Sequence, residues 1–229
     1  MNAAPVPALR VRRLGRVAYA PIWQQMKDFV DARVASTPDE LWLLEHEPVY
    51  TLGLAGDPAH VLNPGDTPVV QTDRGGQVTW HGPGQAVVYV LLDMQRRALG
   101  PRELVRLLEE AAIRVLAEYG IGGARRPKAP GVYVDGAKIA ALGLRIRRHC
   151  SYHGLALNVA PDLAPFRGIN PCGYAGLAVT SLAALGVQTT LAEAGTRLIA
   201  ALSGLLDRRA ASAGASADNA PIPAGTDTP

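Results

Sequence analysis

The sequence predicts an α+β fold in which helices flank a central mixed or antiparallel sheet. Roughly six to eight strand-like apolar runs and about three long helical stretches follow one another in mixed order. The dipeptide Asp135-Gly136 lies between two of the strand-like runs and predicts an antiparallel hairpin. The chain of 229 residues is 48% hydrophobic and 19% charged, which suits a globular protein with a sizeable core.

The first elements along the chain are a strand and a helix. Residues 1–9 are rich in Ala and Pro, so we expect them to be disordered. Residues 11–20 predict a strand, and Pro21 suits the first position of a helix. The apolar side chains that recur at helical spacing in this helix are Ile22, Met26, Phe29, Val30 and Val34.

Three or four more strands are expected before the next helix. Two apolar runs, 41–46 and 49–53, predict either two strands or one strand broken at the proline between them. A short strand is expected at 69–72. Residues 87–92 are apolar throughout and predict a central strand buried on both faces.

The second half of the chain contains two helices and the hairpin. A helix begins at Pro101 and ends at Gly120. The hairpin covers 131–140 and its second strand continues to residue 146. Residues 152–159 alternate between apolar and polar and predict another strand.

The last helix and the tail define the domain boundaries. Thr190 and Glu193 form a capping box before an apolar helical stretch. From Arg208 onward the chain offers almost nothing to bury, so residues 208–229 are expected to be disordered. A single folded domain is therefore expected over residues 10–207.

Composition restricts the compartment and the partners. No apolar run approaches the ~20 residues that span a bilayer, and the N-terminal segment lacks the apolar region of a signal peptide. We therefore expect a soluble, cytoplasmic protein that does not bind membranes. Positive residues gather at 10–16, 125–128 and 145–148, which indicates either an acidic partner or a solvated face. No aromatic interleaving or motif supports nucleic-acid binding.

The most informative stretch is residues 74–85, whose sequence is RGGQVTWHGPGQ. Its glycines allow the backbone to approach another group closely, directly before the central strand. The stretch is therefore either a long turn or a cradle for a ligand. It lacks the lysine and hydroxyl residue of a Walker loop, so a phosphate-binding P-loop is not expected.

Cys172 and Lys138 are candidates for chemistry. Cys172 lies in the sequence Asn-Pro-Cys-Gly, where proline fixes the backbone and glycine leaves the sulfur unobstructed. A thiol attacks as a thiolate, so its free pKa of ~8.5 must be lowered by a nearby positive charge. Lys138, inside an apolar strand, is a candidate for that charge. The alternative is a lysine whose ammonium snorkels to water.

Other polar residues in these segments have both structural and functional interpretations. His81 and His153 are each either a structural or a catalytic histidine. Arg74 either pairs with a carboxylate or caps the loop. Cys150 lies between histidines, but their spacing matches no zinc motif, so no metal is expected and Cys150 is interpreted as a packing residue.

Four blocks, in this order, resemble the lipoyl/octanoyl transferases of the LipB family. They are residues 74–85, residues 131–143 with GVY and KIAALG, residues 153–159 with HGLALNV, and residues 169–173 with INPCG. The resemblance covers about residues 10–207.

The resemblance implies the fold of the biotin/lipoate protein ligase catalytic domain and an acyltransferase without a cofactor. Such an enzyme moves an octanoyl group from octanoyl-acyl carrier protein to a lysine of lipoyl domains, in 2-oxoacid dehydrogenases and the glycine cleavage H protein. By resemblance, Cys172 forms an acyl-thioester and Lys138 lowers the pKa of that cysteine. The implied substrate-binding residues are Arg74, Gly75, Gly76, Gln77, Val78, Thr79, Trp80, His81, Ala141, Leu142, Gly143, Gly154, Leu155 and Ala156.

The residues themselves fit acyl transfer through a thioester on Cys172. The candidates for the general base are Lys138, His81 and His153. Candidate oxyanion donors are the backbone N–H groups of Gly75, Gly76 and Leu142-Gly143. Small or apolar residues suited to an acyl slot are Ala140, Ala141, Leu142, Leu155 and Ala156. Two alternatives remain open: an ATP-dependent lipoate or biotin ligase on the same fold, with Lys138 binding phosphate, and a non-catalytic module that binds the acyl carrier.

Overall fold

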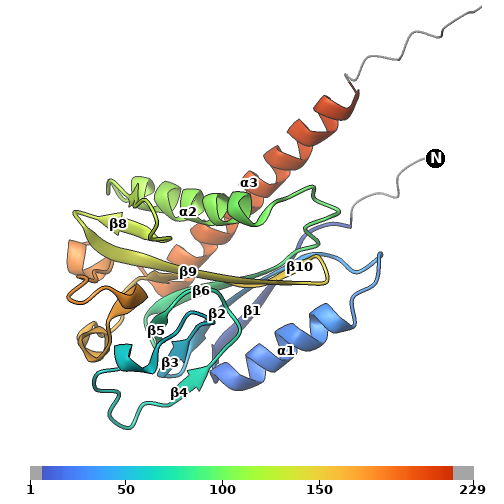
Figure 1. The fold of residues 1–229 in the computed structure, drawn as a ribbon. Coiled ribbons are helices and arrows are strands. Elements are labelled where there is room, and N and C mark those ends of the chain that lie inside the picture. Colours follow the sequence, from blue (N-terminus) through green and yellow to red (C-terminus); the bar gives the residue numbers. More distant parts are fainter. Residues whose placement is uncertain (1–6, 219–229) are drawn as a thin grey trace, which may run out of the picture.

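The computed structural model describes residues 7–218, except for the side chains of Cys172 and of residues 210–218. It confirms the predicted α+β class (Figure 1). A seven-stranded sheet has the order β1-β2-β6-β10-β9-β8-β7, and a three-stranded sheet has the order β4-β3-β5. In the large sheet β1 pairs in parallel with β2, and the other neighbours pair antiparallel.

The elements have the following bounds. The large sheet contains β1 (Arg10–Val17), β2 (Glu40–His46), β6 (Gln85–Leu91), β7 (Ala124–Arg125), β8 (Val132–Val134), β9 (Ala137–Arg147) and β10 (Cys150–Asn158). The small sheet contains β3 (Val49–Leu52), β4 (Val69–Gln71) and β5 (Val78–His81). The α-helices are α1 (Tyr19–Asp31), α2 (Pro101–Glu118) and α3 (Leu191–Asp218). Short 3₁₀ helices are η1 (Pro58–His60), η2 (Ala164–Gly168), η3 (Pro171–Gly173) and η4 (Ala183–Leu185).

The central strand β6 explains why its sequence is apolar throughout. Its alternate residues Ala86, Val88 and Val90 belong to a core that includes α2 and α3. Its other residues Val87, Tyr89 and Leu91 belong to a second core that includes α1. Figure 1 shows α2 and α3 on one side of the large sheet, with α1 and the small sheet on the other. The large sheet is therefore covered on both faces.

Several predicted boundaries are wrong. Helix α1 begins at Tyr19, not at Pro21, so the predicted first strand ends earlier, at Val17. Proline is tolerated inside the first helical turn because the N–H groups there have no intrahelical partner. Helix α1 also ends at Asp31, so Val34 lies beyond it and is 63% exposed.

Two strands and a helical extension were not anticipated. Glycines on both sides of β5 conceal its strand pattern, and β7 has only two residues. Helix α3 continues past Arg208 to Asp218, through an alanine-rich stretch with high helix propensity. Residues 1–6 and 219–229 lie outside the described residues, so the expectation of disorder there is untested. No helix in the described range 7–218 is long and apolar enough to cross a membrane.

A buried carboxylate fixes the segment that enters β2. Asp39 is fully buried and forms ion pairs with Arg33, Arg96 and Arg97, the second at 2.7 Å. The backbone N–H of Asp93 also donates to it at 2.8 Å. Burial raises the pKa of Asp39, but the Asp93 N–H and the guanidinium groups outweigh burial and hold the pKa below its ordinary value.

Replacing this carboxylate should destabilise the fold. Asp39→Ala leaves buried guanidinium charges uncompensated, so the free energy of unfolding should fall by about 3 kcal/mol or more. Urea denaturation at pH 7 measures this loss. The control is Asp31→Ala, because Asp31 and its partner Arg147 are 39% and 41% exposed; its loss should stay below about 1 kcal/mol. Equal stability of the two variants would contradict the assignment.

Candidate active site

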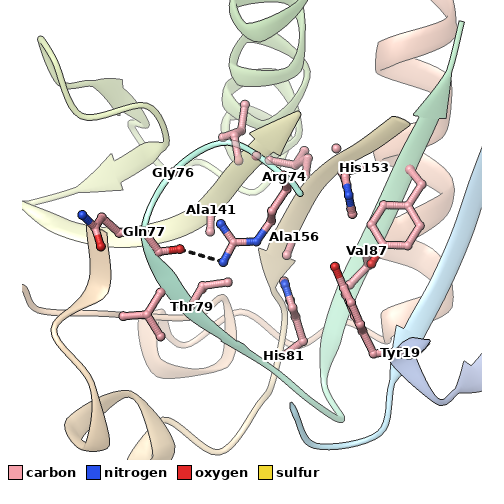
Figure 2. A pocket seen from close by; sticks show the side chains of 16 residues that line it. Tyr19, Arg74, Gly76, Gln77, Thr79, His81, Val87, Ala141, His153 and Ala156 are labelled. Carbon is pink, nitrogen blue, oxygen red and sulfur yellow. Dashed lines mark hydrogen bonds between the residues drawn. The ribbon is translucent and has the colours of Figure 1, made fainter. Parts of the chain in front are cut away.

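A pocket lies between the large sheet and the small sheet (Figure 2). The large sheet contributes β6, β9 and β10, and the small sheet contributes β5. The loop that enters β5 and the start of α1 complete the lining. The lining residues are Tyr19, Arg74, Gly76, Gln77, Val78, Thr79, His81, Val87, Tyr89, Ala141, Leu142, Gly143, His153, Gly154, Leu155 and Ala156.

Strand register places the small residues of the large sheet side by side. Ala156 of β10 lies opposite Val87 of β6 and Ala141 of β9. Two residues along each strand, and so on the same face, Gly154 lies opposite Tyr89 and Gly143. Side chains in register on neighbouring strands share one face. Rows of alanine and glycine therefore leave a hollow in that face where larger side chains would fill it.

The loop that covers the hollow is held by Arg74, whose side chain is buried. Its guanidinium donates to the carbonyl oxygens of Thr51 at 2.5 Å, Gly75 at 2.9 Å and Gln77 at 2.8 Å, and to the Thr51 hydroxyl. Figure 2 shows the bond to Gln77. The loop is joined to the large sheet by the Gly75 N–H, which donates to Leu144 O at 2.9 Å. Arg74 therefore binds the backbone of the loop.

Asp73 fixes the start of the same loop. It accepts hydrogen bonds from Trp23 Nε1 at 2.9 Å, from His153 Nε2 at 3.0 Å and from the Tyr152 hydroxyl. Burial raises the pKa of Asp73, but these donors outweigh burial and lower its pKa below the ordinary value. His153 itself adopts a left-handed φ of 61°, which is uncommon for histidine. The structure thus gives His153 a contact that positions the loop.

Figure 2 shows Gln77 at one end of the pocket and Tyr19 and His153 toward the other. At the Tyr19 end the Tyr19 ring stacks on His81, with ring centroids 6.3 Å apart. The Tyr19 hydroxyl is buried and has no hydrogen-bond partner among the described residues. Burial raises the pKa of Tyr19 to about 12. This end of the pocket is therefore lined by buried aromatic side chains that carry polar groups.

The tautomer of His81 follows from its neighbours. The Gln85 amide nitrogen donates to Trp80 O at 3.3 Å and to Asn158 Oδ1 at 2.9 Å, so its oxygen faces His81 Nδ1 at 3.1 Å. His81 Nδ1 therefore donates, and Nε2 is left as an acceptor. Burial, then the nearby His46 and Arg74, lower the pKa of His81 well below its ordinary value. His81 is thus neutral at pH 7.

Lys138 does not reach solvent. Its side chain is buried, with the residue 4% exposed. Its ammonium donates to Pro130 O at 3.2 Å and lies 5.2 Å from the centroid of the Tyr133 ring. Gly131 leaves room for it, because a Cβ there would lie 3.2 Å from the Lys138 nitrogen. The alternative of a lysine that snorkels to water does not fit this burial.

The segment that carries Cys172 lies beside the pocket, and the chain that follows it pairs with the strand of Lys138. Cys172 is in η3, and its side chain is outside the described part of the structure. A Cβ on the adjacent Gly173 would lie 3.5 Å from Gln77 Cγ, so η3 adjoins the Gln77 end of the pocket. Further along, Val179 forms a parallel bridge with Lys138. The chain segment that follows Cys172 therefore reaches Lys138 within seven residues.

Most of the expected substrate-binding residues line the pocket, with two exceptions. Gly75 lies on the outer side of the loop and lines a neighbouring groove. Trp80 packs in the core of the small sheet against Phe166, with ring centroids 5.5 Å apart. The lining also includes Tyr19, Val87 and Tyr89, which the sequence did not predict because they lie in a helix start and a strand with no local motif. Within the described residues, no cluster of three or more histidine, cysteine or acidic side chains is arranged to hold a metal ion.

The chain matches the family model described as the lipoyl protein ligase A/B catalytic domain over residues 18–203. It is 59% identical over 203 residues to an octanoyltransferase of Aromatoleum aromaticum, which covers 89% of this chain and 88% of the relative. It is also 59% identical over 192 residues to an octanoyltransferase of Methylococcus capsulatus, covering 84% and 93% of the two chains.

Solved structures share the fold. A lipoate-protein ligase A bound with ATP superposes with a TM-score of 0.71 at 14% identity, covering 90% of this chain and 92% of the ligase. The biotin protein ligase of Aquifex aeolicus superposes with a TM-score of 0.54 at 13% identity, covering 88% and 71%. At these identities the two structures show a common fold alone.

Removing Asp73 should loosen the loop that covers the pocket. Asp73→Ala deletes the acceptor of its hydrogen bonds, so amide hydrogen exchange at Gly75 and Gly76 should accelerate about tenfold or more. Because the pKa of Asp73 is lowered, its contribution is present at neutral pH and is lost as the pH falls below about 4. The control is Asp28→Ala, whose carboxylate contacts Gln24 on the surface of α1. Unchanged exchange at Gly75 would show that Asp73 does not position the loop.

Proposed function

Since the chain belongs to the lipoyl protein ligase A/B catalytic-domain family and is an octanoyltransferase-type acyltransferase within it, we propose that octanoyl-acyl carrier protein is its donor. The acceptor is a lysine amine on the lipoyl domains of 2-oxoacid dehydrogenases and on the glycine cleavage H protein. Octanoyl transfer then passes through a thioester on Cys172. This transfer is the first step by which a cell attaches lipoyl groups made from its own octanoyl groups.

The observation that carries the proposal is the slot formed by small residues in register. Ala141 and Ala156 lie opposite each other across β9 and β10 and open a narrow apolar hollow. A saturated acyl chain has the shape and polarity for such a hollow. The mouth near Gln77 adjoins η3, which carries Cys172, so a chain in the slot places its carbonyl toward the proposed nucleophile.

The proposed reaction has two halves. The Cys172 thiolate attacks the thioester carbonyl of the donor and forms a tetrahedral intermediate. This intermediate collapses to a thioester on Cys172, and the donor sulfur leaves as a thiolate. The acceptor amine then attacks the Cys172 thioester, an amide bond forms, and the Cys172 thiolate leaves. Backbone N–H groups near the mouth, at Gly76 and in Leu142-Gly143, are suited to stabilise each oxyanion. Neither half requires ATP, because a thioester is already activated.

Lys138 is the proposed partner of the thiolate and the base for the amine. In the first half its ammonium gives a proton to the departing donor thiolate, and in the second half the neutral lysine takes the proton that the acceptor amine loses. A buried ammonium favours a nearby anion, because low polarity strengthens their attraction. Lys138 lies on the strand that pairs with the segment following Cys172. His81 and His153 line the pocket instead, where they bond to Gln85 and Asp73. This placement favours Lys138 over either histidine for proton transfer at the mouth.

The proposed thioester can be trapped directly. Incubation with octanoyl-acyl carrier protein and no acceptor should increase the intact mass by one octanoyl group, located on Cys172 after acid quench. Addition of an unmodified lipoyl domain should move that mass to the domain. Cys172→Ala should show neither event because it lacks the nucleophile, whereas Cys150→Ala should show both.

Full transfer by a folded Cys172→Ala protein would contradict the thioester. Release of AMP from ATP and free octanoate by the wild type would favour the ATP-dependent ligase. Binding of the octanoyl carrier protein without turnover would favour the non-catalytic module.

Filling the hollow should impair the use of octanoyl donors. Ala141→Leu inserts a larger side chain into the slot, so kcat/KM for octanoyl-acyl carrier protein should fall about 10–100-fold, with less effect on a butanoyl donor. Ala140→Leu is the matched control, because Ala140 faces the core shared with α2 and α3 and is fully buried. Its main effect should be a loss of about 1–3 kcal/mol in unfolding free energy. An Ala141→Leu protein with wild-type preference for octanoyl over butanoyl would rule out this slot.

A further inference from the structure

A second groove opens beside the mouth of the acyl pocket. Its volume is about 340 Å³. It shares Gly76, Gln77, Leu142 and Gly143 with the pocket, so the loop and β9 form a common wall. Away from that wall it is lined chiefly by apolar groups, among them Val105 of α2, Pro130 and Leu144.

The groove also adjoins the segment of the proposed nucleophile. Tyr174, two positions after Cys172, lines it and is 47% exposed. The Tyr174 N–H donates to Pro171 O at 3.1 Å, which ties this residue to η3. A molecule in the groove would therefore meet both the mouth of the acyl pocket and the region of Cys172. A thioester donor needs a path with these two neighbours.

One cation stands at the rim of the groove without an acidic partner. Lys128 is exposed and has a left-handed φ of 61°. The neighbouring Arg125 pairs with Glu109 at 3.1 Å and with Glu110 at 2.8 Å. No ion pair or hydrogen bond of the Lys128 side chain occurs among the side chains that the structure describes. Its ammonium is thus available to a bound anion.

We propose that this groove binds the phosphopantetheine arm of the donor, with Lys128 contacting the phosphate. The arm is a narrow chain of methylene, amide and branched apolar groups, with the thioester at one end and a phosphate at the other. Apolar walls suit the chain and the rim cation suits the phosphate. The assignment rests on the proposed function, because it takes the donor to be an acyl carrier protein.

Another groove near Cys172 lacks these features. It has a volume of about 500 Å³ and is lined by Pro171, Arg167 and Ala178 among others. None of its lining residues also lines the acyl pocket. A donor whose acyl chain is in the pocket therefore finds no wall in common with this groove. Arg167, an exposed cation five positions before Cys172, therefore serves as a matched control.

The test compares two synthetic donors that differ by one phosphate. Octanoyl-4′-phosphopantetheine and octanoyl-pantetheine are supplied to the full chain with an unmodified lipoyl domain as acceptor. The wild type should show a KM about five- to tenfold lower for the phosphorylated donor, since one partly exposed ion pair is lost without it. In Lys128→Met this ratio should fall to about one, and in Lys128→Arg it should be largely kept.

The other outcomes distinguish failure of the groove assignment from failure of the proposed function. A Lys128→Met protein that keeps the ratio, or an Arg167→Met protein that loses it, overturns the groove assignment. So does competitive inhibition of the phosphorylated donor by ATP at micromolar concentration, which would mark the groove as a nucleotide site. A wild type that transfers from both donors with equal KM overturns the groove alone. A wild type that transfers from neither these donors nor octanoyl-acyl carrier protein defeats the proposed function and the groove together.

Discussion

The buried guanidinium of Arg74 joins the two sheets that enclose the pocket. Its bonds to the Thr51 carbonyl and hydroxyl tie it to β3, and its bonds to the Gly75 and Gln77 carbonyls fix the path of the loop. The loop in turn donates from Gly75 to Leu144 on β9. A buried cation is tolerated only when its donors are satisfied, and here backbone carbonyls satisfy them. The position of Gly76 and Gln77, and hence of the pocket mouth, depends on this one side chain.

The close approach of loop and sheet also requires glycine at particular positions. A Cβ on Gly143 would lie 3.0 Å from Gly75 O and 3.1 Å from Arg74 Cδ. A Cβ on Gly154 would lie 2.1 Å from Val88 O, a distance that real side chains do not show. These glycines therefore allow Arg74 and β6 to lie where they do. The alanines beside them leave the hollow. The glycines therefore permit the close packing of loop and strands, and the alanines leave space for a ligand.

The sequence predicted the parts that depend on local chemistry. The Asp135-Gly136 turn, the helix from Pro101 and the apolar strand β6 are confirmed, since turn residues, capping positions and apolar patterns act over a few residues. Most of the residues expected to bind substrate do line one pocket. Their mutual arrangement depends on which residues of β6, β9 and β10 lie opposite one another. Strand register joins segments about seventy residues apart, and no local pattern encodes it. Tyr19 was missed for the same reason, because tertiary packing alone brings it beside His81.

Several titratable side chains lie at or beside the Tyr19 end of the pocket, and burial keeps them uncharged near pH 7. Burial lowers the pKa of His46 to about 4 and raises that of Tyr19 to about 12. Burial likewise lowers the pKa of His81 and raises the pKa of Tyr89. His46 donates to Val17 O at 3.0 Å and accepts from the Tyr89 hydroxyl at 2.6 Å, as a neutral ring does. An alkyl terminus that enters this end therefore displaces solvent from neutral dipoles, which costs far less than the desolvation of ions. Lys138, outside the pocket lining, is the buried cation nearest along the chain to the Cys172 segment. A slot without charged groups at its Tyr19 end suits a substrate whose chain is apolar, and a buried cation on β9 suits a carbonyl oxygen that becomes anionic during transfer.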